Sequence, residues 1–109
     1  MSMDYIEKHI ATLQDVSVDK ELVESATTYK VNGTLFAIYY NQHTPKRISL
    51  RGDEQLTHAL REQYESVVLP DNLDRKTWNT FILTPQFTEQ TVIDFITHSY
   101  IESGGIYLR

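Results

Sequence analysis

The dipeptide Asn32-Gly33 limits the fold of this chain more than any other part of its sequence, because it lies between two segments with the composition of β-strands. Both central residues of a type I′ turn need a positive φ, which Asn and Gly tolerate better than other residues. Such a two-residue turn joins neighbouring antiparallel strands. We therefore predict a hairpin with strands over residues 25–31 and 35–40.

Apolar residues recur at helical spacing in three other segments, and each stripe predicts a helix with one buried face. The first helix covers about three turns and buries Met3, Ile6, Ile10 and Leu13. The second is capped by Asp53 and places inward Leu56, Ala59, Leu60 and Tyr64. The third begins at Thr88, ends at Gly104-Gly105, and places inward Val92, Phe95, Ile96, Ser99 and Tyr100. Residues 15–23 have the composition of a loop.

Three further strands are expected over residues 47–51, 67–69 and 78–83. In the first of them Arg47, Ser49 and Arg51 alternate with apolar residues, which predicts one solvent-exposed face. The element order is therefore α-β-β-β-α-β-β-α. It predicts a single α+β domain over residues 1–109, with a largely antiparallel sheet of about five strands packed against three helices.

The composition restricts the classes of function. The chain has ten basic and fifteen acidic residues and a net charge of −5, which weighs against a dedicated nucleic-acid-binding protein. It contains no Cys, which excludes thiolate catalysis and cysteine-ligated metals. The first 14 residues lack the apolar run of a signal peptide, and no apolar run is long enough to cross a bilayer. We expect a cytoplasmic protein without membrane contact.

Three segments together form a recognisable pattern: residues 29–37 (Tyr-Lys-Val-Asn-Gly-Thr-Leu-Phe-Ala), residues 72–80 (Asn-Leu-Asp-Arg-Lys-Thr-Trp-Asn-Thr) and His98-Ser99-Tyr100. This pattern resembles the MmcQ/YjbR family of small bacterial proteins over about residues 25–102. The turn before Trp78 departs from the family pattern, because it lacks a tyrosine and two histidines. The resemblance implies a fold like that of type III secretion chaperones and frataxin-like sheets. It also implies the label of DNA binding, which the family carries by fold analogy.

Six residues are candidates for contact with nucleic acid. Arg47, Arg51, Arg75 and Lys76 are expected to contact phosphates, and four such contacts imply a slope of about −3.6 in log affinity against log salt for duplex DNA. Trp78 suits either a stacking platform for a base or a core position, and we favour the core. Asn79 is expected to anchor the backbone of its turn.

Other polar clusters suit structure better than chemistry. His98, Ser99 and Tyr100 are consecutive on a helix, so their side chains diverge by about 100° each and cannot form a nucleophile–base pair. Glu54, His58 and Glu62 span about 12 Å of helix, which is too far for one metal ion. The common catalytic motifs are missing from the sequence. We expect no enzyme, no metal and no cofactor.

Two functional hypotheses follow. The first is weak, sequence-nonspecific binding of DNA or RNA through the arginine-bearing strand and the Arg75-Lys76 turn. The second is a protein-interaction module or homodimer without catalytic activity, which a secretion-chaperone-like fold permits.

Overall fold

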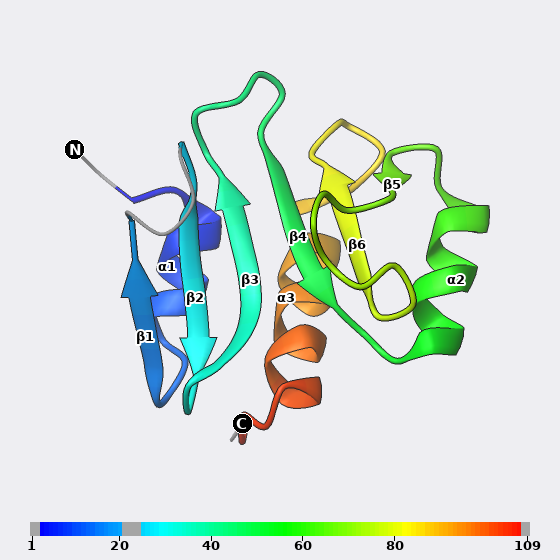
Figure 1. The fold of residues 1–109 in the computed structure, drawn as a ribbon. Coiled ribbons are helices and arrows are strands. Elements are labelled where there is room, and N and C mark those ends of the chain that lie inside the picture. Colours follow the sequence, from blue (N-terminus) through cyan, green and yellow to red (C-terminus); the bar gives the residue numbers. More distant parts are fainter. Residues whose placement is uncertain (1–2, 21–24, 108–109) are drawn as a thin grey trace.

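The computed structural model describes residues 3–20 and 25–107, which form three helices and six strands. Figure 1 shows these elements in the order α1 (Tyr5–Ala11), β1 (Val16–Asp19), β2 (Thr27–Val31), β3 (Thr34–Tyr40), β4 (Arg47–Arg51), α2 (Glu54–Gln63), β5 (Val67–Val68), β6 (Trp78–Ile82) and α3 (Glu89–Glu102).

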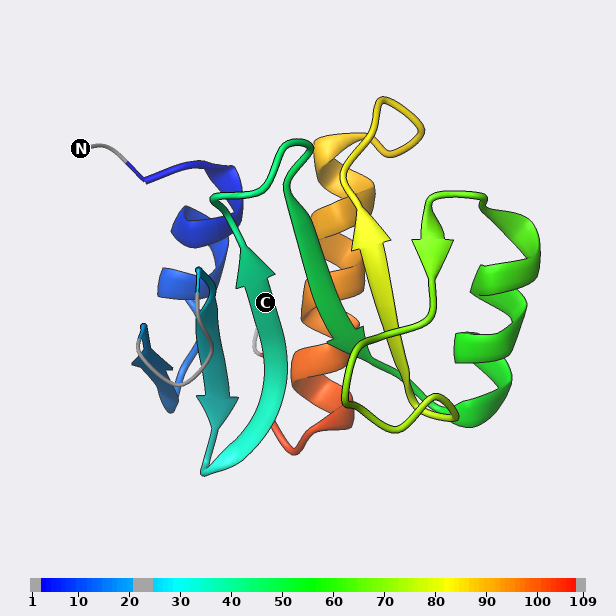
Figure 2. The same ribbon diagram turned by 45° about the horizontal axis from the view of Figure 1, so that its top comes forward.

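The six strands form one sheet in the order β1-β2-β3-β4-β6-β5, and every neighbouring pair is antiparallel. Helices α1 and α3 lie on one face of this sheet (Figure 1), while α2 lies beside β5 and β6 at one edge (Figure 2). The expected α+β class with an antiparallel sheet is confirmed. The sheet has one strand more than the sequence predicted.

The predicted hairpin is confirmed. Val31 of β2 pairs with Thr34 of β3, and the two residues between them have positive φ values of 49° and 82°. The register then shifts, because Lys30 pairs with Leu35 whereas Tyr29 pairs with Ala37. The extra residue, Phe36, makes a β-bulge, so that Phe36 and Ala37 are both completely buried.

The N-terminal region differs from the sequence prediction in two ways. Residues 16–19, expected within a loop, form the edge strand β1, whose Val-Ser-Val-Asp alternation is too short to identify without its partner β2. Helix α1 covers seven residues rather than three full turns, and Met3 lies outside it with half of its surface exposed. Asp4 caps the helix and forms a capping box with Glu7, which stops the helix from starting earlier.

The other two helices follow their predicted starts, since Asp53 caps α2 and Thr88 caps α3. Helix α3 buries Val92, Ile96, Ser99 and Tyr100, as predicted, and Phe95 is partly buried. In α2 the prediction was wrong for Ala59, which is exposed, while Thr57 is buried in its place. Most buried apolar residues of the helices and strands form one core cluster, to which Ile38 and Trp78 do not belong.

Candidate nucleic-acid interface

One face of the sheet carries neither α1 nor α3, and we call it the open face (Figures 1 and 2). The register places on it the row Thr28, Ile38, Ser49 and Thr80 from four adjacent strands. Residues of the opposite parity, such as Tyr39, Ile48 and Leu50, belong to the hydrophobic core under the helices. The two sides of each central strand therefore face different surroundings.

The middle of the open face is buried, so the prediction that Ser49 is exposed to solvent was wrong. Ser49 is fully buried, and its hydroxyl lies 2.7 Å from the Thr80 hydroxyl on the next strand. It lies on β4, one of the two central strands of the six-stranded sheet, between Arg47 and Arg51 on the same face. The paired hydroxyls satisfy each other's hydrogen bonds.

Cations are concentrated on the open face. The six strands contain four charged residues, and the register puts all four on this face: Lys30, Arg47 and Arg51, with Asp19 on the edge strand β1. Arg47 and Arg51 are both partly buried and lie about 13 Å apart along β4. Arg47 also has a buried Nε that donates no hydrogen bond within the described part of the chain.

Trp78 is buried, as the sequence analysis favoured, with 7% of its surface exposed. It lies on the open face opposite Arg51, where the chain between β5 and β6 passes over the sheet (Figures 1 and 2). The Gly52 amide donates to the Thr77 carbonyl at 2.8 Å and holds this end of the turn against β4. A ring so covered offers no face on which a base could stack, so its role here is packing.

Asn79 anchors α2 rather than its own turn, which corrects the prediction. Its amide donates to the Thr57 carbonyl at 2.9 Å, and its oxygen accepts from Nη1 of Arg61 at 2.9 Å. The same Nη1 donates to the carbonyls of Arg75 and Trp78. Arg61, which the sequence analysis did not select, therefore ties the turn to α2, and no local pattern in the sequence marks it.

Arg75 and Lys76 lie apart from the strand arginines. Together with Arg61 and His58 they line a surface hollow of about 630 Å³ between α2 and the turn. None of the open-face cations lines this hollow. Asp74 belongs to the same turn, and its carboxylate accepts the Lys76 amide at 2.9 Å. The structure thus divides the four predicted basic residues into an open-face pair and a turn pair.

Ser99 has a structural role that its sequence context did not reveal. Its hydroxyl donates to the Phe36 carbonyl at 2.6 Å and accepts the Arg51 amide at 2.8 Å. The bulge at Phe36 leaves these two backbone groups without partners across the β3–β4 ladder, which ends at the pair Ala37 and Leu50. Helix α3 therefore supplies the missing bridge between the strands.

The neighbours of Ser99 also serve the core. The Tyr100 hydroxyl donates to the Gln14 carbonyl at 2.6 Å, and its ring meets Phe36 edge-on with centroids 5.5 Å apart. His98 has a buried Nε2 without a hydrogen-bond partner among the described residues. The family-like segment His98-Ser99-Tyr100 therefore holds α3 against the sheet, and its hydroxyls are engaged in hydrogen bonds.

Asp4 organises the end of the sheet where α1 begins. One of its carboxylate oxygens accepts from the Tyr39 hydroxyl at 2.5 Å and from Lys46 Nζ at 3.3 Å. Burial raises the pKa of Tyr39, and the hydrogen bond to Asp4 raises it further. Partial burial also acts to raise the pKa of Asp4, but hydrogen bonds from Glu7, Tyr39 and Lys46 outweigh it, so the pKa is lowered overall.

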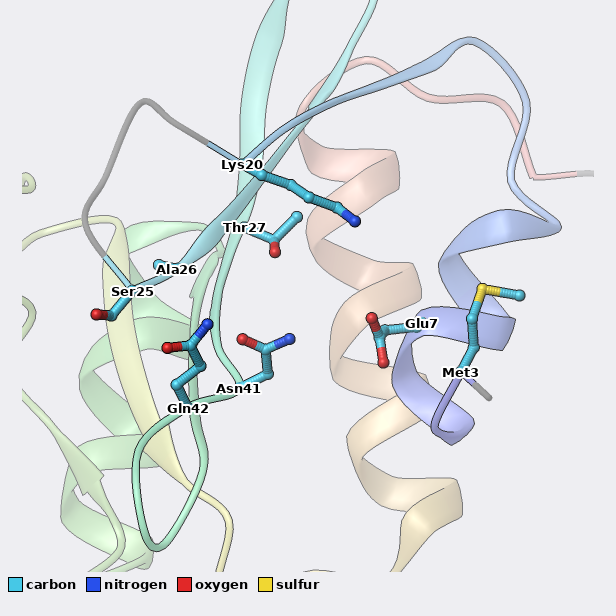
Figure 3. A pocket seen from close by; sticks show the side chains of 8 residues that line it. All are labelled: Met3, Glu7, Lys20, Ser25, Ala26, Thr27, Asn41 and Gln42. Carbon is cyan, nitrogen blue, oxygen red and sulfur yellow. The ribbon is translucent and has the colours of Figure 1, made fainter. Parts of the chain in front are cut away.

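A polar pocket of about 460 Å³ separates α1 from the ends of β2 and β3 (Figure 3). Glu7 projects from α1 toward Thr27, Asn41 and Gln42 on the opposite side, and Met3, which precedes the helix, and Lys20 also line the pocket. The pocket contains none of the six predicted site residues. Elsewhere in the described ranges, no three His, Cys, Asp or Glu side chains are placed to hold a metal ion. No helix there is long and apolar enough to cross a membrane.

The fold is shared with solved structures of low sequence identity. A Deinococcus radiodurans protein with a DUF419 domain superposes with a TM-score of 0.82 at 19% identity, over 89% of this chain and 74% of that one. A Pseudomonas syringae protein superposes with a TM-score of 0.73 at 14% identity, over 93% of this chain and 99% of that one. No curated protein matches the sequence. The model of the YjbR family matches residues 11–101, and this chain belongs to the YjbR family.

Proposed function

We propose that this domain binds single-stranded nucleic acid, weakly and without base preference, through the open face of its sheet. The observation that carries the proposal is the sorting of charge. The chain has a net charge of −5, yet the strand residues of the open face include three cations, Lys30, Arg47 and Arg51, and one acid, Asp19, at the edge. Lysine and arginine neutralise phosphates by releasing condensed counterions, which provides nonspecific affinity.

The shape of the surface favours a single strand over a duplex. The major groove of DNA admits a helix or a two-stranded ribbon, whereas this face belongs to a six-stranded sheet. A single strand can lie across such a face, with its phosphates near the cations. Tyr40 pairs with Arg47 in the register and is only partly buried; its ring meets that of His43 at 5.3 Å between centroids, and a base would stack on the remaining ring surface. The ring of Trp78 is buried and therefore not available for a base.

Salt dependence tests the proposal directly. Anisotropy of a labelled 12-nucleotide single strand, titrated between 20 and 200 mM salt, should give a slope of about −2 in log affinity against log salt for three phosphate contacts. Each of Lys30→Gln, Arg47→Gln and Arg51→Gln should reduce the slope by about 0.7. The matched control is Lys8→Gln, which removes an exposed lysine of α1 on the opposite side of the sheet. An equal effect of the control would show that net charge, and not this face, governs binding.

A second candidate function is self-association through the edge strand β1. Beside this strand an apolar hollow of about 300 Å³ is lined by Ile10, Leu13 and Val16, and Val18 and Met3 are 55% and 50% exposed. An unprotected edge strand pairs readily with a second copy of itself. Sedimentation over a range of concentrations tests this, since Val18→Lys should abolish any dimer. A monomer at every concentration would exclude this candidate.

A further inference from the structure

The hollow between α2 and the turn before β6 has an excess of positive charge. Arg61, Arg75 and Lys76 line it, together with His58, and Glu54 is the one carboxylate on its wall. Arg75 and Lys76 are exposed. Glu62 does not line the hollow, and its carboxylate lies 3.2 Å from Nε2 of His58. None of the three cations forms a salt bridge with any described residue, so their charge is available to a ligand.

Arg61 differs from an ordinary surface arginine because its position is fixed. Its Nη1 donates to three neutral oxygens, the carbonyls of Arg75 and Trp78 and the side chain of Asn79. These bonds hold the guanidinium in place but do not neutralise it. Its Nε and Nη2 make no bond within the described residues and are not buried, so they remain open to solvent where Arg61 lines the hollow.

The turn itself is also held in a single conformation. The Asp74 carboxylate accepts the Lys76 amide, the Asp74 carbonyl accepts the amides of Thr77 and Trp78, and the Thr77 carbonyl accepts the Gly52 amide. Arg75 and Lys76 are therefore presented on a rigid backbone beside Arg61. Preorganised donors lose less entropy when they bind an anion than donors on a flexible loop.

We infer that this hollow is a phosphate-binding site, distinct from the open face, that takes a terminal phosphate group through Arg61, Arg75 and Lys76. A phosphate monoester carries a charge of about −1.5 to −2 at neutral pH and three strong acceptor oxygens. Three cations line the hollow against Glu54, and the Asp74 carboxylate lies in the turn bonded to the Lys76 amide, so the excess of positive charge that faces a ligand is modest. Arginine can hold two of the oxygens in a bidentate contact, and lysine adds a point charge. The site does not depend on nucleic-acid binding by the open face, and it suits a small phosphorylated molecule or the phosphorylated end of a strand.

Backbone amide NMR with pyrophosphate as the probe tests the inference, with ionic strength held constant by chloride. The largest shift changes should fall in residues 54–62 and 74–77, rather than in β2 and β4. Arg75→Gln and Lys76→Gln should each weaken pyrophosphate binding by about threefold to tenfold, the range for losing one ordinary hydrogen bond, because solvent screens these exposed charges. Lys8→Gln should leave it unchanged. Arg61→Lys keeps the charge but loses the planar fork, and a folded spectrum with weakened binding would support a positioned guanidinium.

Two oligonucleotides then separate the possible sources of the phosphate. A 5′-phosphorylated single strand should shift residues 54–62 and 74–77 more than the same strand without the phosphate, if strand ends are the natural ligand. Equal shifts from the two strands, with pyrophosphate still bound, indicate a small phosphorylated molecule. Shifts spread evenly over all basic residues, or equal shifts from sulfate and pyrophosphate, would overturn the inference. If single strands failed to bind the open face but pyrophosphate still bound the hollow, the proposed function would be wrong and the phosphate-site inference would still hold.

Discussion

The two faces of the sheet use polar residues in opposite ways. On the helix-covered face, the Ser99 hydroxyl lies in an apolar core and bonds backbone groups of two strands. On the open face, Lys30, Arg47 and Arg51 are partly buried and form no salt bridge with a described residue. The difference indicates that polar side chains under the helices maintain the fold, whereas the cations of the open face are free to serve a ligand.

Trp78 tests this division, because it is buried on the open face, as Ser49 and Thr80 are. We expect Trp78→Ala to lower the free energy of unfolding by about 3 to 5 kcal/mol, the range for removing a large buried aromatic side chain. Urea denaturation followed by circular dichroism measures this. A variant of unchanged stability that no longer bound single strands would reverse the assignment and make the ring part of the ligand site.

Ser99→Ala removes the bridge on the covered face. It leaves the Phe36 carbonyl and the Arg51 amide without partners, and unpaired buried groups cost about 1 to 3 kcal/mol each. We expect a loss of about 2 to 4 kcal/mol in unfolding free energy and faster hydrogen exchange of the Arg51 amide. Thr97→Ala, in the same helix but partly exposed, is the control and should cost less. Equal costs for the two variants would contradict the bridging role.

Replacing Arg61 and replacing Arg51 should have different effects on stability. Arg61→Gln should cost about 1.5 to 3 kcal/mol of stability, because Nη1 of Arg61 serves three acceptors that hold the turn. Arg51→Gln keeps the backbone amide that bonds Ser99, so only the charge of a partly buried side chain is lost. We expect a change within about 0.5 kcal/mol in stability. Thermal unfolding of both variants measures the contrast, and similar losses would mean that Arg51 also supports the fold.

The smallest expected change in unfolding free energy comes from lowering the pH. Because the folded-state pKa of Asp4 lies below its unfolded value of about 3.9, its stabilisation is complete above that pH and is lost as pH falls through the folded pKa. Burial lowers the pKa of His9 below its unfolded value of about 6.5. Stability therefore declines as the pH falls below that value, because the unfolded chain then binds a proton more readily than the folded one. Asp4→Asn should flatten the decline in stability below pH 4 and leave the decline near pH 6 unchanged. Urea titrations at several pH values distinguish the two steps.

Local signals in the sequence account for much of the fold. The turn residues Asn32 and Gly33 specified the hairpin because few other pairs adopt two positive φ angles. The apolar stripe of α3 and the caps Asp53 and Thr88 located two helices, since periodicity and capping act within a few residues. Strand β1 was missed because four residues of alternating pattern gain stability only from pairing with β2.

The candidate sites depended on contacts between distant residues, which no local pattern encodes. The sequence alone determined that basic residues cluster between positions 46 and 76, that the net charge is negative and that Trp78 suits a core. Only the tertiary structure decided that Lys30 joins Arg47 and Arg51 on the open face, that Arg75 and Lys76 instead meet Arg61 across a hollow, and that Ser99 closes a gap between strands. The physical reason is that strand register and helix docking set which side chains share a surface, and both are long-range properties of the packed chain.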